Sequence, residues 1–208
     1  MLRWVNNPKK GIEMSLLNKK ITEKEYESVV VENGFEKKSS MNKHTLINDK
    51  TKLLIVGTIT PPDGTGFFYT SKHNKLYGYI DDSLNTNLKK KKKELRECNS
   101  DDERADIVEQ IKKELDQVGI SFIDVAKYVI RKEGSSKDTD IKHIVLDYEA
   151  FKNISKIKHV ICNSRDAKEC FDKITNNRYK SEYLPQRCGR GTIGKKEEWV
   201  RKLREYTE

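Results

Sequence analysis

Three short segments of the chain are almost continuously apolar, and each ends at polar or turn-forming residues. They are residues 52–57 (Lys-Leu-Leu-Ile-Val-Gly), 119–125 (Gly-Ile-Ser-Phe-Ile-Asp-Val) and 158–163 (Lys-His-Val-Ile-Cys-Asn). Short runs rich in branched residues are typical of strands that are buried on both faces of a sheet. The pattern therefore predicts three strands of a mostly parallel sheet.

Helical periodicity appears between these strands, in strongly charged segments. Residues 84–118 carry apolar side chains three or four positions apart, which predicts one or two amphipathic helices with a break near residues 99–100. These side chains are Ile107, Ile111, Leu115 and Val118. Thr22 and Glu25 have the spacing of a capping box, which predicts a short helix at about residues 23–33. A final helix is expected near residues 195–206.

The order of these elements favours an α/β fold in one domain. A chain of 208 residues is long enough for one sizeable core. We expect residues 1–45 to form a polar N-terminal extension with the short helix, and residues 46–208 to form the α/β domain. Residues 84–118 are then a charged helical insertion in that domain. In such folds ligands bind beyond the carboxyl ends of the strands.

The charge of the chain points to a polyanionic partner. Lysine and arginine together number 42, against 33 aspartate and glutamate residues, which gives a formal net charge of +9. An excess of this sign favours nucleic-acid binding. Basic enzymes that never touch DNA share this feature, and the lysine run at 89–93 is also typical of a solvated helix face.

The apolar runs and the cysteines exclude several other classes. No run is long enough to span a membrane, and no secretory signal pattern is present at the N-terminus, so we expect a cytoplasmic protein without membrane association. The cysteines include no pair at metal-binding spacing, which predicts reduced thiols, no metal and no cofactor. They are Cys98, Cys162, Cys170 and Cys188.

Four segments at or after the predicted strands carry more specific patterns. The first joins Ile-Val-Gly-Thr-Ile-Thr-Pro (55–61) to Gly-Thr-Gly-Phe-Phe-Tyr-Thr-Ser-Lys-His-Asn-Lys-Leu-Tyr (64–77). The second combines residues 119–125 with Arg-Lys-Glu-Gly-Ser-Ser (131–136) and Asp-Ile (140–141). The third is His-Val-Ile-Cys-Asn-Ser-Arg-Asp-Ala (159–167), and the fourth joins Leu-Pro-Gln-Arg-Cys-Gly-Arg-Gly (184–191) to Glu-Glu-Trp (197–199).

These segments resemble the motifs of the uracil-DNA glycosylase superfamily, especially its mismatch-specific and hypoxanthine-DNA glycosylase branches, over about residues 44–206. The resemblance implies a three-layer sandwich around a central, mostly parallel sheet. It also implies an N-glycosidic bond hydrolase that flips a deaminated or mismatched base, uracil or hypoxanthine, out of DNA and excises it. Such a protein would be a monomer, and associated with the nucleoid when it acts on DNA.

The resemblance assigns roles to individual residues. Asn74 matches a catalytic Asn, and Asp124 stands where other branches have a base-reading Asn, so it is a second catalytic candidate. Two further groups are expected to hold the DNA. The base-binding group is Thr58, Ile59, Phe68, Tyr69 and Asn163, and the backbone-binding group is Arg187, Cys188, Gly189 and Arg190. The structural alternatives are a turn or helix cap for Asn74, a helix cap for Asp124 and a core position for Phe68.

The chain also departs from the family pattern. Thr60, Pro61 and Pro62 follow Ile59 where the family has a proline–glycine turn, and a catalytic Asn of that turn is absent. Gln186 and Cys188 occupy positions where serines are usual. A second hypothesis is therefore a catalytically inactive member that acts as a binding module for DNA, RNA or a modified nucleotide.

Overall fold

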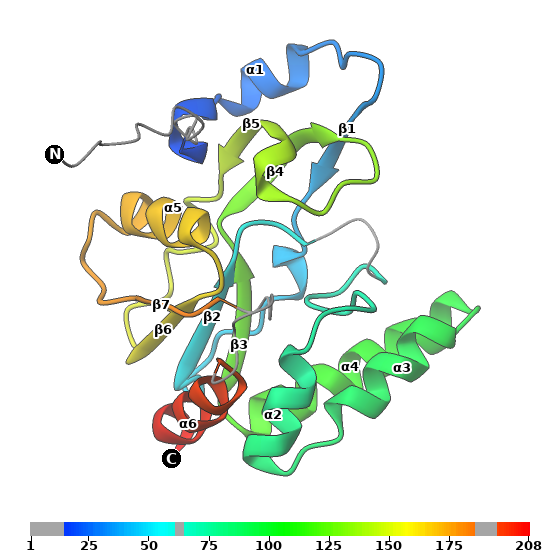
Figure 1. The fold of residues 1–208 in the computed structure, drawn as a ribbon, viewed down its shortest axis with the longest axis vertical. Helices are drawn as coiled ribbons and strands as arrows, with labels where there is room; N and C mark the ends of the chain where they lie inside the picture. Colours follow the sequence, from blue (N-terminus) through cyan, green and yellow to red (C-terminus); the bar gives the residue numbers. More distant parts are fainter. Residues whose placement is uncertain (1–14, 61–64, 186–194) are drawn as a thin grey trace, which may run out of the picture.

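The computed structural model describes residues 15–60, 65–185 and 195–208 (Figure 1). The helices are α1 (Glu23–Ser28), α2 (Leu76–Leu84), α3 (Leu88–Glu97), α4 (Asp101–Gln117), α5 (Arg165–Thr175) and α6 (Lys195–Thr207). The strands are β1 (Phe35–Ser39), β2 (Leu53–Gly57), β3 (Ile120–Asp124), β4 (Ala126–Lys132), β5 (Ile141–Leu146), β6 (His159–Cys162) and β7 (Glu182–Tyr183). Short 3-10 turns are η1 (Leu16–Lys19), η2 (Asn42–His44) and η3 (Asp138–Asp140).

The strands form two sheets. A four-stranded parallel sheet has the order β3-β2-β6-β7, and a three-stranded antiparallel sheet has the order β1-β4-β5. The three strands predicted from apolar runs are β3, β2 and β6, and they lie next to one another in the parallel sheet. Gly57 and Asp124, the last residues of β2 and β3, are partners in the register. The carboxyl ends of the three strands therefore meet at one edge.

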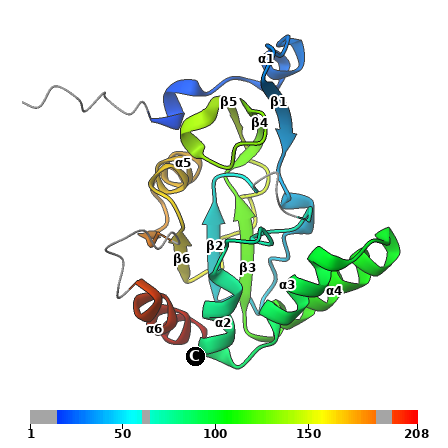
Figure 2. The ribbon, with the colours of Figure 1, turned by 45° about the vertical axis from the view of Figure 1, so that its right-hand side comes forward.

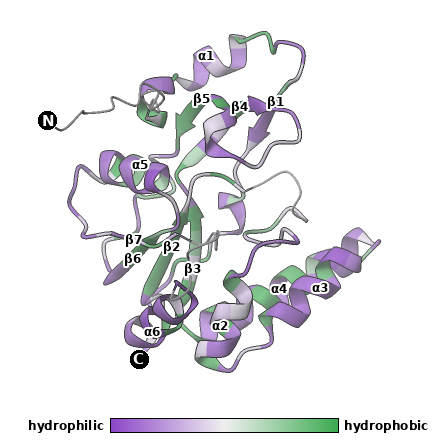
Figure 3. Ribbon diagram, in the orientation of Figure 1, coloured by the Kyte–Doolittle hydropathy of each residue, from purple (hydrophilic) through white to green (hydrophobic). Residues whose placement is uncertain are grey.

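Strand β2 is the centre of the fold, because all five of its residues are buried. Successive side chains of a strand point to opposite faces. Leu53 and Ile55 accordingly pack in a core with side chains of α2, α3, α4 and α6, while Leu54 and Val56 pack in a second core with α5, β4 and β5. Figure 3 shows β2 and β3 as hydrophobic strands between more polar helices. Both faces of the parallel sheet are thus covered.

The charged segment at 84–118 is a pair of helices, as predicted. α3 and α4 lie side by side and extend away from the sheets (Figure 2). The carboxylate of Asp81, a residue of α2, stabilises the start of α3. It accepts from the backbone N–H groups of Leu88 and Lys89, at 2.8 and 2.9 Å. Ser100 caps α4 by accepting from the N–H of Glu103. The break near residues 99–100 is confirmed.

The region before residue 45 contributes more than the predicted helix. The capping box of Thr22 and Glu25 is present, but α1 ends at Ser28 rather than near residue 33. Phe35–Ser39 then forms β1 and pairs with β4. Sequence patterns did not predict this strand, because Glu-Lys-Lys-Ser after the phenylalanine has no apolar alternation. The division of the chain at residue 45 stays a prediction.

Within the described ranges, no helix has the length and apolar character that crossing a membrane would require.

Gly119 joins α4 to β3 in the left-handed conformation, with φ of +72°. A Cβ at this position would lie 2.9 Å from the carbonyl oxygen of Lys50. We expect Gly119→Ala to lower the free energy of unfolding by more than ~2 kcal/mol, because strain of about 1–2 kcal/mol for the conformation adds to the clash. Urea unfolding measures this loss in the free energy of unfolding. Gly134→Ala is the control, because its φ is +68° but nothing lies within 4 Å of the added Cβ. An equal loss in both variants would contradict the role of the clash.

Candidate active site

Three polar side chains converge on Gly57, at the carboxyl end of β2. The position that a Cβ of Gly57 would occupy lies 2.8 Å from Oδ1 of Asp124, 2.9 Å from Oη of Tyr69 and 3.7 Å from Nδ2 of Asn163. A larger residue would displace these groups, so the approach requires glycine. A carboxyl, a phenol and an amide therefore share one point at the edge where α/β sheets bind ligands.

Asp124 is the buried acid of this site, with 2% of its surface exposed. Its Oδ2 accepts from the backbone N–H of Thr60 at 2.9 Å and from the Thr60 hydroxyl at 3.0 Å. Asn42 fixes the backbone of Asp124, because its amide donates to the carbonyl and accepts from the N–H. Burial raises the pKa of Asp124 to about 6, against the lowering effect of the Thr60 hydrogen bonds. A carboxyl group with this pKa exchanges protons near neutral pH.

Tyr69 lies beside Asp124 in an unusual backbone conformation. Its φ is +58°, which is rare for a bulky residue and is often found at functional sites. The ring packs edge-on against Phe122, with 4.9 Å between centroids, and the hydroxyl accepts from Nδ2 of Asn163 at 3.3 Å. Burial, and then the charge of Asp124, raise the pKa of Tyr69 well above its usual value. The phenol therefore remains a neutral hydrogen-bonding group.

The other predicted base-binding residues have different surroundings. Thr58 reaches the same edge, where its hydroxyl donates to Oδ2 of Asp138 at 2.8 Å. Phe68 is only 1% exposed and packs in the core with Phe67. Ile59 packs in the core on the opposite face of the sheet. The structure thus brings Thr58, Tyr69, Asp124 and Asn163 together, whereas Phe68 and Ile59 are core residues in this conformation.

Asn74 lies in the same loop as Tyr69, just before α2. Its Oδ1 accepts from the backbone N–H of Leu76 at 2.9 Å, which is a turn contact just before α2, whose N-cap is Lys75. This is the structural alternative named for Asn74, and it leaves the catalytic role a prediction. The side chain is partly exposed, so this turn contact and a contact with a ligand are compatible.

The loop that carries Tyr69 and Asn74 is held by two basic side chains of α3. Lys92 donates to the carbonyl oxygen of Asn74 at 2.7 Å, and Arg96 donates to that of Thr70 at 3.3 Å. Lys92 is 8% exposed, whereas Lys90 and Lys93 in the same run are exposed and pair with glutamates one turn later. One member of the lysine run therefore supports the site.

Sequence reasoning missed four residues of this edge. They are Asn42, Thr60, Asp138 and Ser164. Asn42 and Asp138 come from short turns, and each is at least 80 positions from its partner, Asp124 or Thr58, so no local pattern could connect them. The predicted backbone-binding residues Arg187, Cys188, Gly189 and Arg190 lie outside the described residues.

The residues that the structure describes contain no group of three or more His, Cys, Asp or Glu side chains placed to hold a metal ion. Cys98, Cys162 and Cys170 are free, buried thiols.

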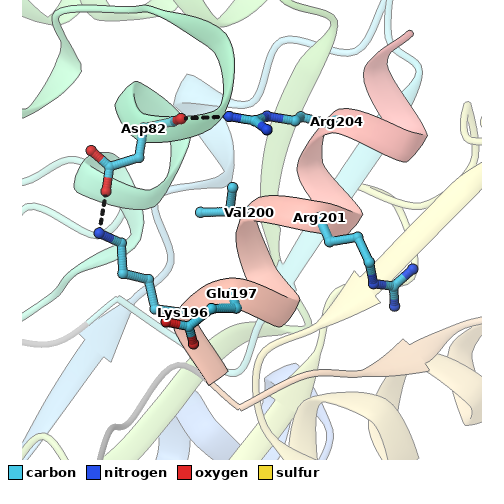
Figure 4. A pocket seen from close by; sticks show the side chains of 6 residues that line it. All are labelled: Asp82, Lys196, Glu197, Val200, Arg201 and Arg204. Carbon is cyan, nitrogen blue, oxygen red and sulfur yellow. Dashed lines mark hydrogen bonds and ion pairs between the residues drawn. The ribbon is translucent and has the colours of Figure 1, made fainter. Parts of the chain in front are cut away.

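An open groove of about 690 Å³ lies elsewhere, between α2 and α6 (Figure 4). Lys196 pairs with Asp82 at 2.7 Å across it, and Arg204 donates to the carbonyl oxygen of Asp82 at 3.2 Å. These contacts join the two helices, and Asp124, Tyr69 and Asn163 do not line the groove. We therefore place the candidate site at Gly57 and not in this groove.

Comparison with known proteins supports the fold. No protein-family model matches the chain, and no curated protein does. The chain is similar to a solution NMR structure of a Methanosarcina acetivorans protein that is described as a candidate uracil DNA glycosylase. The two share 18% identity with a TM-score of 0.55, over 79% of this chain and 96% of the other. The expected α/β fold of the uracil DNA glycosylase type is confirmed, and its branch is not distinguished.

We expect Lys92→Met to loosen the loop that carries Tyr69. The variant keeps the buried methylene groups but removes a charged hydrogen bond, so the free energy of unfolding should fall by about 1–2 kcal/mol. Amide hydrogen exchange of residues 70–76 should become faster. Lys93→Met is the matched control and should change stability by less than about 0.5 kcal/mol. Equal exchange in both variants would show that Lys92 does not hold the loop.

The buried Asp124 should make stability depend on pH. Because its pKa of about 6 is raised from 3.8, the folded state binds the proton more tightly, and stability falls as pH rises from about 4 to 6. This difference corresponds to at most about 3 kcal/mol. Asp124→Asn should remove this part of the pH dependence, and the variant should be more stable than the wild type at pH 7–8. Unfolding curves at several pH values give the free energy of unfolding of both proteins. If it depended on pH equally in the wild type and in Asp124→Asn, the burial of a titrating carboxyl at this position would be contradicted.

Proposed function

We propose that the protein is a monofunctional DNA glycosylase that flips a deaminated or mismatched base, uracil or hypoxanthine, out of DNA and hydrolyses its N-glycosidic bond. The observation that carries the proposal is the convergence of Asp124, Tyr69 and Asn163 on Gly57. The fold likeness supports it, because the similar structure is described as a candidate enzyme of that class. The helix–sheet–helix layering and the hypoxanthine or mismatch-specific branch are finer parts of the same proposal.

The site offers the groups that base excision needs. A flipped base requires a stacking ring and hydrogen bonds to its edge. Tyr69 and the amide of Asn163 supply them, and Thr58 adds a hydroxyl at the same edge. Asp124 is the acid–base group, since its pKa lies near neutrality. The amide of Asn74 orients water or stabilises the positive charge that develops on the sugar. The reaction requires no cofactor.

Binding of the base requires the Tyr69 loop to move. Tyr69 is 6% exposed and Phe68 is 1% exposed, so neither ring offers a free face in this conformation. The loop is anchored mainly by side chains of α2 and α3, including Tyr77, which donates to the carbonyl of Phe68. An outward shift of this loop would expose the Tyr69 ring above Gly57. Arg187 and Arg190 then hold the phosphates beside the flipped nucleotide.

Two observations favour the alternative of an inactive binding module. The side-chain oxygen of Asn74 is engaged in a turn contact with Leu76, and the predicted stacking rings are buried. Such a protein would bind DNA, RNA or a modified nucleotide through its basic surface without breaking a bond.

Excision from labelled oligonucleotides that carry uracil, hypoxanthine or xanthine separates these two functions. We expect abasic sites from the wild type, and a rate at least about 10²-fold lower for Asp124→Asn, because an acid–base group contributes about 10²–10⁴. Asn74→Ser keeps a side-chain oxygen for the turn contact with Leu76 but removes the amide, and it should also slow excision. Asp106→Asn, on the exposed surface of α4, is the control. No cleavage by the wild type, with salt-sensitive DNA binding retained, would establish the binding module instead.

A further inference from the structure

Two threonines that flank Ile59 each hold a carboxylate at the carboxyl end of β2. The hydroxyl of Thr60 donates to Oδ2 of Asp124 at 3.0 Å, and that of Thr58 donates to Oδ2 of Asp138 at 2.8 Å. Two residues of fully extended chain span at most about 7 Å, so the two anchoring points are close. The Thr-Ile-Thr segment, where the chain departs from the expected turn, thus brings two acids to one place.

Asp138 reaches this edge from the antiparallel sheet, since η3 joins β4 to β5. The donors and acceptors of the hydrogen bonds that hold Asp138 can be assigned in order, from Ser164 through Thr58 to Asp138. Ser164 accepts from the N–H of Ala167 at 2.9 Å and lies 3.0 Å from the Thr58 hydroxyl, whose single proton goes to Asp138. Ser164 is therefore the donor to Thr58. Asp138 therefore accepts at the end of this chain of hydrogen bonds.

The two acids also interact through their charges. The charge of Asp138 contributes to the raised pKa of Asp124, after burial, and to that of Tyr69. Asp124 is almost fully buried, whereas Asp138 is only partly buried. The groups around them are also charged. Arg131 lies beneath η3, where it donates to the carbonyl of Lys137, and Asp147 shares the Asn42 amide with the backbone of Asp124.

We propose that Asp138 is the second catalytic carboxylate of this site and that it works as a pair with Asp124, an inference that rests on the proposed glycosylase activity. The N-glycosidic bond breaks and its electron pair goes to the base, which takes up the proton of Asp124. A water molecule forms the new bond to C1′ and gives its proton to Asp138. Environments that separate the proton affinities of two carboxyl groups are typical of such acid–base pairs.

The test compares Asp138→Asn with Asp140→Asn. Asp140 lies in the same turn, but its carboxylate accepts from Ser135 instead of facing β2. We expect Asp138→Asn to lower the excision rate at least about 10²-fold, with DNA affinity within about threefold of the wild type, and Asp140→Asn to leave both unchanged. Asp138→Asn should also remove the acidic limb of the pH–rate profile, which a purely structural role would not do.

A second readout does not depend on activity. Removing the charge of Asp138 should lower the pKa of Asp124, as followed by carbon NMR of its carboxyl group. Thr58→Val, which releases Asp138 without altering either acid, should slow excision about tenfold and shift the acidic limb of the pH–rate profile to higher pH, which loss of a contact with the base would not do. This variant covers the case in which Asp138→Asn unfolds. An Asp138→Asn rate within about twofold of the wild type overturns the pairing and leaves the glycosylase function intact. A wild type that excises no base overturns both.

Discussion

The missing side chain of Gly57 is the constraint on which the site depends. Asp124 Oδ1 and the Tyr69 hydroxyl occupy the space that a Cβ would need. This approach is possible because β2 is the central strand, with β3 on one side and β6 on the other. The parallel register then places Asp124 opposite Gly57 and Asn163 just beyond β6. The cost of burying this carboxyl is offset by two hydrogen bonds from Thr60 to Oδ2, and Asn42 satisfies the backbone of Asp124.

Elements outside the parallel sheet complete the site. The turn η2, which follows β1, supplies Asn42, and η3 between β4 and β5 supplies Asp138. The helix pair α3–α4 supplies Lys92 and Arg96, which hold the loop of Tyr69 from the other side. The antiparallel sheet and the charged helices are therefore parts of the site's support. Their distance along the chain from β2 explains why their contribution has no local sequence signature.

Sequence patterns predicted the parts of the fold that are governed by local rules. The apolar runs gave β2, β3 and β6, and the helical spacing gave α4 with its apolar face. Asp124 and Asn163 were predicted as site residues because they lie at the carboxyl ends of predicted strands. The antiparallel strands were missed because charged residues interrupt their apolar positions, such as Glu36 to Lys38 in β1, Lys127 in β4 and Lys142 in β5. The burial of Phe68 likewise has no local signature, because an aromatic in a glycine-rich loop can be core when helices pack over the loop. Lys92 could not be told from its neighbours, since burial of one lysine in a run depends on tertiary packing.

Positive charge predominates in the chain as a whole, whereas two carboxyl groups lie at the site. The chain as a whole carries +9, whereas Asp124 and Asp138 lie together at the edge of β2. Excess surface lysine and arginine attract a polyanion over long range, where salt screens the interaction. Buried carboxyls instead act over a few ångströms and are screened much less. Phosphates brought near the site add negative charge, which further favours the protonated form of Asp124. In the proposed reaction, binding of the DNA backbone would thus favour the protonated Asp124 that cleavage of the glycosidic bond uses.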